Sequence, residues 1–161
     1  MKKLDLSQAI NALANVGVIA GIIFLAVELR QNTQALRAQT RDSLTEKTMT
    51  YLGWMATSPE LAAIENKARS IGIGSLDPTE RNQYRNFVGA QLREWENSFY
   101  QYERGLFTQA DYEARRETWR NRLLEVPDSS FYRSIWEGGR THFSPSFGEE
   151  IDGILAEGAN N

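Results

Sequence analysis

The first part of the chain is apolar and uncharged over a long continuous stretch. No residue between Leu6 and Val27 carries a formal charge, and almost every residue from Val16 onward in this stretch is apolar. About 20 mainly apolar residues form a helix that crosses a hydrocarbon core of roughly 30 Å. The pattern therefore predicts a transmembrane helix over residues 1–29.

A signal peptide and a buried helix of a soluble bundle have a similar composition. A cleaved signal peptide has an apolar region of about 7–15 residues followed by small residues at the cleavage site, and neither feature is clear here. Gln8, Asn11 and Asn15 favour a buried helix, whereas the apolar run that follows them favours a membrane. We prefer the membrane interpretation, with the segment retained in the protein.

Gly17 and Gly21 form a G-x-x-x-G pair within the span. Such a pair removes side-chain bulk and lets the backbone of a second helix approach. Asn11 and Asn15 are expected at the same contact, because an amide left unpaired in hydrocarbon is costly and can hydrogen-bond across helices. The pattern favours a helix–helix contact. The alternative is that glycine is simply common in membrane helices, with the asparagines in the headgroup region.

Glu28 is the first charged residue after the apolar stretch. It follows Gly21 by seven residues, so the two lie on nearly the same side of a helix. A ring of such glutamates from several copies would line a cation path. The plainer interpretation is a boundary charge, which needs no special purpose beside Arg30 at the water interface.

The helix is expected to continue in water as a helical extension over residues 30–57. No glycine follows Val27 before Gly53, and no proline occurs before Pro59. Apolar residues recur along the extension at roughly heptad or half-heptad spacing and form a narrow stripe, namely Leu29, Leu36, Leu44, Tyr51 and Met55. Weak parallel self-association and docking onto the C-terminal domain fit this stripe equally well.

Clear helix-start signals divide the rest of the chain. Ser58-Pro59, Asp77-Pro78 and Ser144-Pro145 each put a capping side chain before a proline at the first helical position. Glu80 completes a capping box with Asp77, and Thr108 with Asp111 resembles a further start. With Gly105, Val126-Pro127 and Gly138-Gly139 as stops, these signals predict helices over 7–57, 59–70, 78–105, 108–126, 129–141 and 145–157.

Aromatic and aliphatic residues advance by three or four positions along the later helices. Such stripes are typical of packed core rather than of an aromatic ligand site, and one of them contains Tyr84, Val88, Leu92, Trp95, Phe99 and Tyr102. No strand pattern occurs. The sequence therefore predicts an all-α protein, in which a long N-terminal transmembrane helix continues into a small helical bundle over residues 58–161.

Several motifs resemble a widespread group of uncharacterised bacterial proteins. The matching residues are Arg30, Gln31, Asn32, Thr33, Glu96, Asn97, Tyr100, Gln101, Gly105, Trp119, Trp136, Phe143 and Phe147. The resemblance covers most of the chain. It implies a single N-terminal membrane helix that ends in an Arg-Gln-Asn-Thr motif and a small helical domain, and it implies no activity.

Glu96, Asn97 and Gln101 form a polar cluster among the aromatic residues. They would present amides and a carboxylate to a small polar ligand. The preferred interpretation is structural: they satisfy buried backbone groups or arginines such as Arg116, Arg120 or Arg133, and so fix how the helices dock.

Composition argues against several classes of function. The net charge is −3 and the basic residues are scattered, so nucleic acid is not an expected partner. There is no cysteine and only one histidine, His142, which leaves too few residues for thiolate or three-histidine zinc sites. Without a partnered nucleophile or a glycine-rich phosphate loop, we expect no catalytic residues, no metal site and no cofactor, and therefore no enzyme.

The sequence leaves three functional hypotheses. The first is a membrane-anchored helical scaffold or interaction protein that self-associates or binds another membrane protein. The second is a homo-oligomeric pore or ion channel lined by the N-terminal helix, and the third is a small-ligand sensor. Charge around the span discriminates little between the two orientations: Lys2, Lys3 and the amino terminus precede the span, and Arg30, Arg37, Arg41 and Lys47 follow it. The expected location is the bacterial inner membrane, single-pass, with the C-terminal domain in the cytoplasm.

Overall fold

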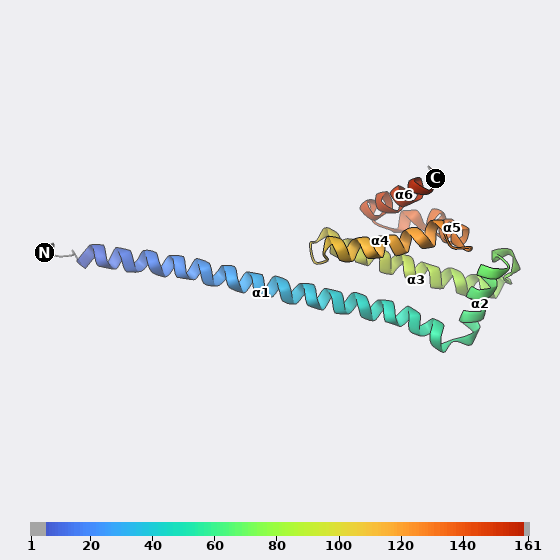
Figure 1. Ribbon diagram of the computed structural model, residues 1–161, viewed down its shortest axis with the longest axis horizontal. Helices are drawn as coiled ribbons and strands as arrows, with labels where there is room; N and C mark the ends of the chain where they lie inside the picture. Colours follow the sequence, from blue (N-terminus) through green and yellow to red (C-terminus); the bar gives the residue numbers. More distant parts are fainter. Residues whose placement is uncertain (1–5, 160–161) are drawn as a thin grey trace. The chain divides into compact units, whose positions relative to one another are not determined.

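The computed structural model describes residues 6–159, and the regular structure in that range is entirely helical (Figure 1). This confirms the all-α prediction. The elements are α1 (Leu6–Thr57), α2 (Pro59–Ser70), the 3₁₀ turn η1 (Ile73–Ser75), α3 (Pro78–Glu103), α4 (Gln109–Leu124), α5 (Ser129–Gly139), the 3₁₀ turn η2 (Arg140–His142) and α6 (Pro145–Ala159).

Local capping explains where the shorter helices begin. The side chain of Asp77 accepts hydrogen bonds from the backbone N–H groups of Thr79 and Glu80, and Glu80 in return accepts from the backbone of Asp77, which is a complete capping box. Ser58 accepts from the N–H of Leu61 at the start of α2. These bonds satisfy donors that a helix leaves unpaired in its first turn.

Gly105 ends α3 and turns the chain toward α4. Its φ of 69° lies in the left-handed region, which costs glycine little. The N–H of Leu106 donates to the carbonyl of Gln101, and the N–H of Gly105 donates to the carbonyl of Tyr102. This pair of bonds is the Schellman arrangement that closes a helix C-terminus.

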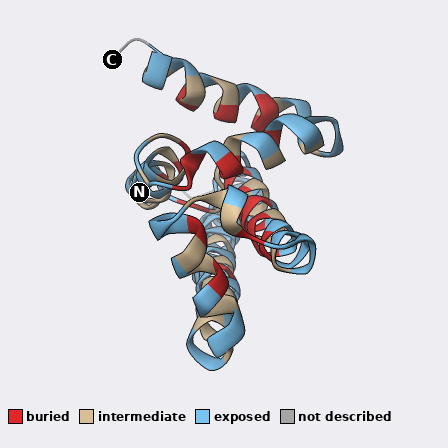
Figure 2. Cartoon of the chain, turned by 90° about the vertical axis from the view of Figure 1, so that its right-hand side faces the viewer, coloured by how far each residue is buried: buried red, intermediate tan, exposed pale blue. Residues whose placement is uncertain are grey.

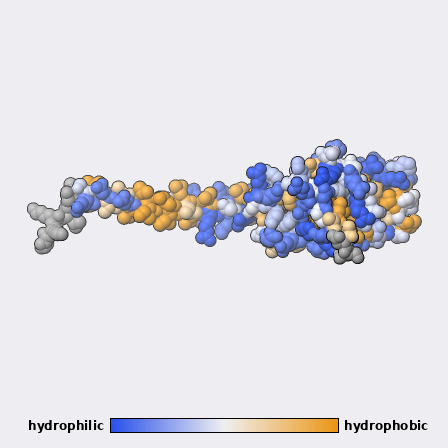
Figure 3. All heavy atoms as spheres, turned by 90° about the horizontal axis from the view of Figure 1, so that it is seen from above, coloured by the Kyte–Doolittle hydropathy of each residue, from blue (hydrophilic) through white to orange (hydrophobic). Residues whose placement is uncertain are grey.

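Contacts divide the chain into two units, Met1–Gln39 and Thr40–Asn161. Within the described residues, the first unit consists of the first part of α1, up to Gln39, and its large apolar side chains from Ile10 to Leu29 are all exposed. Figure 3 shows hydrophobic atoms along this part of α1, with polar atoms before and after them. By length and composition α1 suits a membrane span, and no part of the qualifying window is buried.

The second unit is a helical bundle with an aromatic core. Helices α4 and α6 pack against each other, α5 packs against α3 and α4, and α2 packs against α3. Buried residues lie on the inner faces of these helices (Figure 2). The ring of Trp95 stacks on that of Trp119 with 5.7 Å between centroids and on that of Tyr132 with 6.2 Å.

The last part of α1 belongs to this bundle. Leu44 is only 1% exposed, and Tyr51 and Met55 pack against the buried core, whereas Leu29 and Leu36 of the same sequence stripe are exposed. The stripe therefore divides, and its second half docks onto the bundle. The contacts begin the bundle at residue 40, not at residue 58 as the helix-start signals had indicated, because the core includes Leu44.

Candidate functional site

Gly17 and Gly21 lie on an open surface of α1. A Cβ atom added to either residue would meet no atom within 4 Å. A helix turns by about 100° per residue, so Gly17 and Gly21 lie about 40° apart, whereas Asn15 lies about 160° around the axis from Gly17. The two glycines and the two asparagines therefore lie on two different faces of α1 and not at a single contact. In angle about the helix axis, Asn11 is closer to Asn15 than to Gly17.

A shallow hollow lies on the surface of α1 at the polar end of the apolar stretch. Leu25, Glu28, Leu29 and Asn32 line it, and its volume is about 310 Å³. All four side chains are exposed. Glu28, the first charged residue after the apolar stretch, therefore lies beside apolar side chains.

The three residues of the sequence-predicted polar cluster separate in the structure. Glu96 accepts a hydrogen bond from the backbone N–H of Ser144 at 2.7 Å and one from Arg93 at 2.9 Å, which ties α3 to the start of α6. Asn97 lines an open groove, and Gln101 is half-buried one turn further along. Glu96 thus links α3 to the start of α6, whereas Asn97 faces the groove beside α1.

The arginines expected to pair with this cluster pair elsewhere. Arg116 donates to Glu150 and to Glu157 of α6, each at 2.6 Å. Arg133 donates to the carbonyl of Leu123 at 2.8 Å. These bonds join α4 to α6 and α5 to α4, so the arginines fix helix docking without the polar cluster.

Asp128 is a buried acidic residue that the sequence patterns did not single out. It stands at the N-cap of α5, but its side chain makes no capping bond and instead accepts a hydrogen bond from the hydroxyl of Tyr84. Its second carboxylate oxygen lies 3.9 Å from Nε of Arg69. Burial is the main cause that raises the pKa of Tyr84, and the neighbouring Tyr132 and Asp128 raise it further. This phenol therefore stays protonated and donates its hydrogen bond.

Two further polar groups are satisfied inside the core. The hydroxyl of Tyr132 donates to Oε1 of Gln91 at 2.8 Å. Glu94 accepts from Arg115 at 2.6 Å and from the hydroxyl of Ser98 at 2.9 Å. Since buried polar atoms of this kind are costly when unpaired, the bonds select one packing of the helices. Sequence patterns missed them because their spacing coincides with that of the aromatic stripe.

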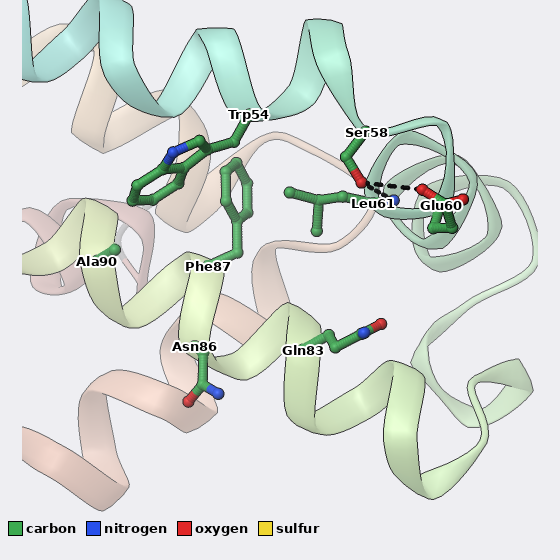
Figure 4. A pocket seen from close by; sticks show the side chains of 8 residues that line it. All are labelled: Trp54, Ser58, Glu60, Leu61, Gln83, Asn86, Phe87 and Ala90. Carbon is green, nitrogen blue, oxygen red and sulfur yellow. Dashed lines mark hydrogen bonds between the residues drawn. The ribbon is translucent and has the colours of Figure 1, made fainter.

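An open groove lies between the end of α1 and α3, and Trp54 is its largest exposed side chain. Figure 4 shows Trp54 extending from α1 and Phe87 extending from α3 into the space between the two helices. The groove has a volume of about 440 Å³, and its lining is largely apolar. A second hollow of about 340 Å³ shares Trp54 and Ala90 and also contains Asn97.

Across residues 6–159, no group of three His, Cys, Asp or Glu side chains is arranged to hold a metal ion. His142 lies in η2 at the surface, and its backbone carbonyl accepts from Arg93.

Comparisons with protein-family models, with curated proteins and with solved structures gave no match. The resemblance based on the Arg30–Thr33 motif and on the residues around Glu96 stays a prediction.

Proposed function

We propose that the chain is a membrane-anchored helical interaction protein that self-associates through α1. The observation that carries the proposal is the contrast between the two units. The apolar side chains from Ile10 to Leu29 are all exposed, whereas the bundle buries an aromatic core of its own. Apolar surface of this extent is typical of a membrane span or a protein–protein contact, and its length suits a bilayer.

The charges near the span support an orientation. Arg30, Arg37 and Arg41 follow the apolar stretch closely, and Lys2 and Lys3 precede it. Basic residues are enriched on the cytoplasmic side of membrane helices, and the larger number follows the span. The proposed arrangement is a single-pass inner-membrane protein whose bundle lies in the cytoplasm.

Membrane extraction tests the anchor. Isolated membranes are washed with alkaline carbonate, and the full chain should stay in the pellet because a spanning helix is held by its apolar surface. The matched control is the fragment 40–161, which lacks the first unit and should be recovered in the supernatant. Release of the full chain by carbonate would contradict the anchor.

The mass of the detergent-extracted particle tests self-association. A dimer or larger oligomer of the full chain is expected, measured by light scattering with the detergent contribution subtracted. A monomer over a wide range of detergent concentration would contradict self-association while leaving the anchor intact, and the partner would then be a different membrane protein.

Glu28 separates this proposal from a pore. An ion-conducting assembly would place this carboxylate on the conduction path, so Glu28→Gln would change ion flux through vesicles without changing the oligomer. The interaction-protein proposal expects no flux with either form. Ion flux that depends on Glu28 would contradict the interaction-protein proposal and would support a pore.

A further inference from the structure

A heptad repeat runs along the exposed part of α1. When Leu29 is assigned to position a, the a positions are Asn15, Ile22, Leu29 and Leu36, and the d positions are Asn11, Val18, Leu25, Asn32 and Gln39. All of these side chains are exposed. Apolar side chains occupy five of these nine positions, between Val18 and Leu36, and amide side chains occupy the other four. Residues at a and d that repeat every seven residues let two helices pack along a continuous line. These positions are called the heptad seam below.

Formal charges avoid the heptad seam. Between Val27 and Asp42 the charged residues are Glu28, Arg30, Arg37 and Arg41, which occupy positions g, b, b and f. None of them is at a or d, where a second helix would bury it at high cost. The seam is therefore free of charge on both sides of the expected membrane boundary.

The hollow on α1 has the form of a coiled-coil hole. In knobs-into-holes packing, an a residue enters a space formed by four residues of the facing helix. Leu25, Glu28, Leu29 and Asn32 are spaced i, i+3, i+4 and i+7, occupy positions d, g, a and d, and line the hollow of about 310 Å³. That set of positions receives an a residue when two helices run parallel and in register.

We infer that two copies of α1 pack parallel and in register along the heptad seam, so that Leu29 of each copy enters the hollow of the other. The inference rests on the self-association proposed above and names its partner and its contact face. The occupant of the exposed face is a second copy of this chain.

The membrane fixes the direction of the pair. Copies that insert with one topology run parallel, which brings each seam residue beside its own counterpart. Asn15 of one copy then faces Asn15 of the other, and a buried asparagine at an a position favours the register in which the two amides meet. Beyond the seam, Asp42 is at position g, whereas Lys47 at position e lines the hollow that faces α3 of its own chain. Within residues 6–159, neither side chain forms a salt bridge.

The bundle contacts α1 mainly through positions b, e and f of the heptad, and Thr50 at position a also lines the hollow beside α3. Leu44 and Tyr51 are at position b, and Met55 is at position f. The next a and d residues, Ser43 and Glu46, are exposed and polar. The apolar part of the heptad seam thus ends at Leu36, and the seam ends at Gln39, before the carboxylates of two Glu46 side chains would meet.

Cysteine cross-linking tests this arrangement, because the natural chain contains no cysteine. Leu36→Cys places a thiol at an a position on the water side of the span. Gln34→Cys, at position f, is the matched control that faces away from the seam. Ala38→Cys, at position c, lies on the side of the helix that carries Gly17 and reports a contact through the glycines.

Each full-length variant is oxidised in native membranes and separated on a non-reducing gel. Maleimide labelling of a separate sample verifies that every thiol is reactive. Leu36→Cys should give at least about tenfold more covalent dimer than Gln34→Cys, because only the parallel in-register seam brings two identical a residues together. Dimer formation led by Ala38→Cys, or equal in all three variants, would overturn the inference.

The particle mass separates this failure from failure of the proposed function. An oligomeric particle in which Leu36→Cys does not cross-link overturns the heptad seam alone. A monomeric particle without cross-links overturns self-association as a whole. The double variant Gly17→Ile/Gly21→Ile should keep the Leu36→Cys cross-link. Loss of that cross-link in a folded, inserted protein would show that the contact lies on the helix face that carries the two glycines.

Discussion

The indole ring of Trp95 stacks on Trp119 and on Tyr132, and the residue is 3% exposed. Trp95→Ala should therefore lower the free energy of unfolding by about 3–5 kcal/mol, the range expected when a large aromatic side chain leaves a packed core. Urea unfolding of the fragment 40–161 measures the change. Trp54→Ala is the control, since Trp54 is 48% exposed and should cost much less. Equal effects at both positions would contradict the packing of α3.

Asp128 and Tyr84 form a buried pair that a double-mutant cycle can measure. Asp128→Ala leaves the Tyr84 hydroxyl without its acceptor, and Tyr84→Phe leaves the carboxylate without its donor. Each change should cost about 1–3 kcal/mol of stability, and the double variant should cost less than the sum because the pair is lost only once. Exposed Glu149→Ala is the control. Additive effects would show that the hydrogen bond contributes nothing.

Buried tyrosines make the bundle sensitive to alkaline pH. Burial is the main cause that raises the pKa values of Tyr84, Tyr112 and Tyr132 above the ordinary value of 10.0. The folded state keeps protons that the unfolded state releases, so this stability is fully present below pH 10 and is lost as the pH rises above it. The loss is about 1.4 kcal/mol per pH unit for each tyrosine.

Thermal melts of the fragment 40–161 between pH 8 and pH 11.5 measure this loss. Tyr132→Phe removes one of the three tyrosines, so the loss of stability above pH 10 should be less steep by the contribution of that one tyrosine. Tyr100→Phe, at a residue that is 48% exposed, is the matched control for removal of a hydroxyl. The same slope in the parent and in Tyr132→Phe would contradict the argument.

Among the helices, α3 has the most complete start. Asp77 caps two N–H groups, and Glu80 accepts both from the backbone of Asp77 and from Lys67 of α2 at 2.6 Å. Asp77→Ala should cost about 1 kcal/mol, the usual value for loss of an N-cap side chain. Ser58→Ala at the start of α2 allows comparison with a single cap. A neutral effect of Asp77→Ala in urea unfolding would mean that water replaces the cap.

The helix starts were predictable from the sequence because their causes are local. Asp77-Pro78 and Ser58-Pro59 place cap and first turn within a few residues, and α3 and α2 begin there. The role of Glu96 was not predictable, because its partner, the N–H of Ser144, lies far along the chain and becomes a neighbour only after the helices dock. Asp128 was missed for a related reason, since a carboxylate before a helix looks like an ordinary cap.

For the whole molecule, the boundary between anchor and bundle is the feature that sequence spacing left open. Leu29, Leu36 and Leu44 belong to one stripe, and only long-range packing separates buried Leu44 from the two exposed leucines. A heptad pattern indicates that one face of a helix is apolar, but it does not indicate which neighbouring helix covers that face. The distinction has a direct consequence for truncation.

A truncation series tests the boundary. The fragment 40–161 keeps Leu44, Tyr51 and Met55 against the core and should be soluble, helical and cooperative in thermal unfolding. The fragment 58–161 loses the side chain of Leu44, for which removal of a buried leucine typically costs about 2–5 kcal/mol, and it also exposes the core surface beneath Tyr51 and Met55. It should melt at a clearly lower temperature or fail to fold.

Leu44→Ala within the fragment 40–161 isolates the largest part of that effect without changing chain length. Exposed Leu52→Ala, on the same stretch of α1, is the matched control and should leave the melting temperature nearly unchanged. If 58–161 melts like 40–161, the end of α1 does not belong to the bundle. The groove beside Trp54 would then lose its α1 side and keep its α2 and α3 sides, and α1 would act as a tether from residue 6 to residue 57.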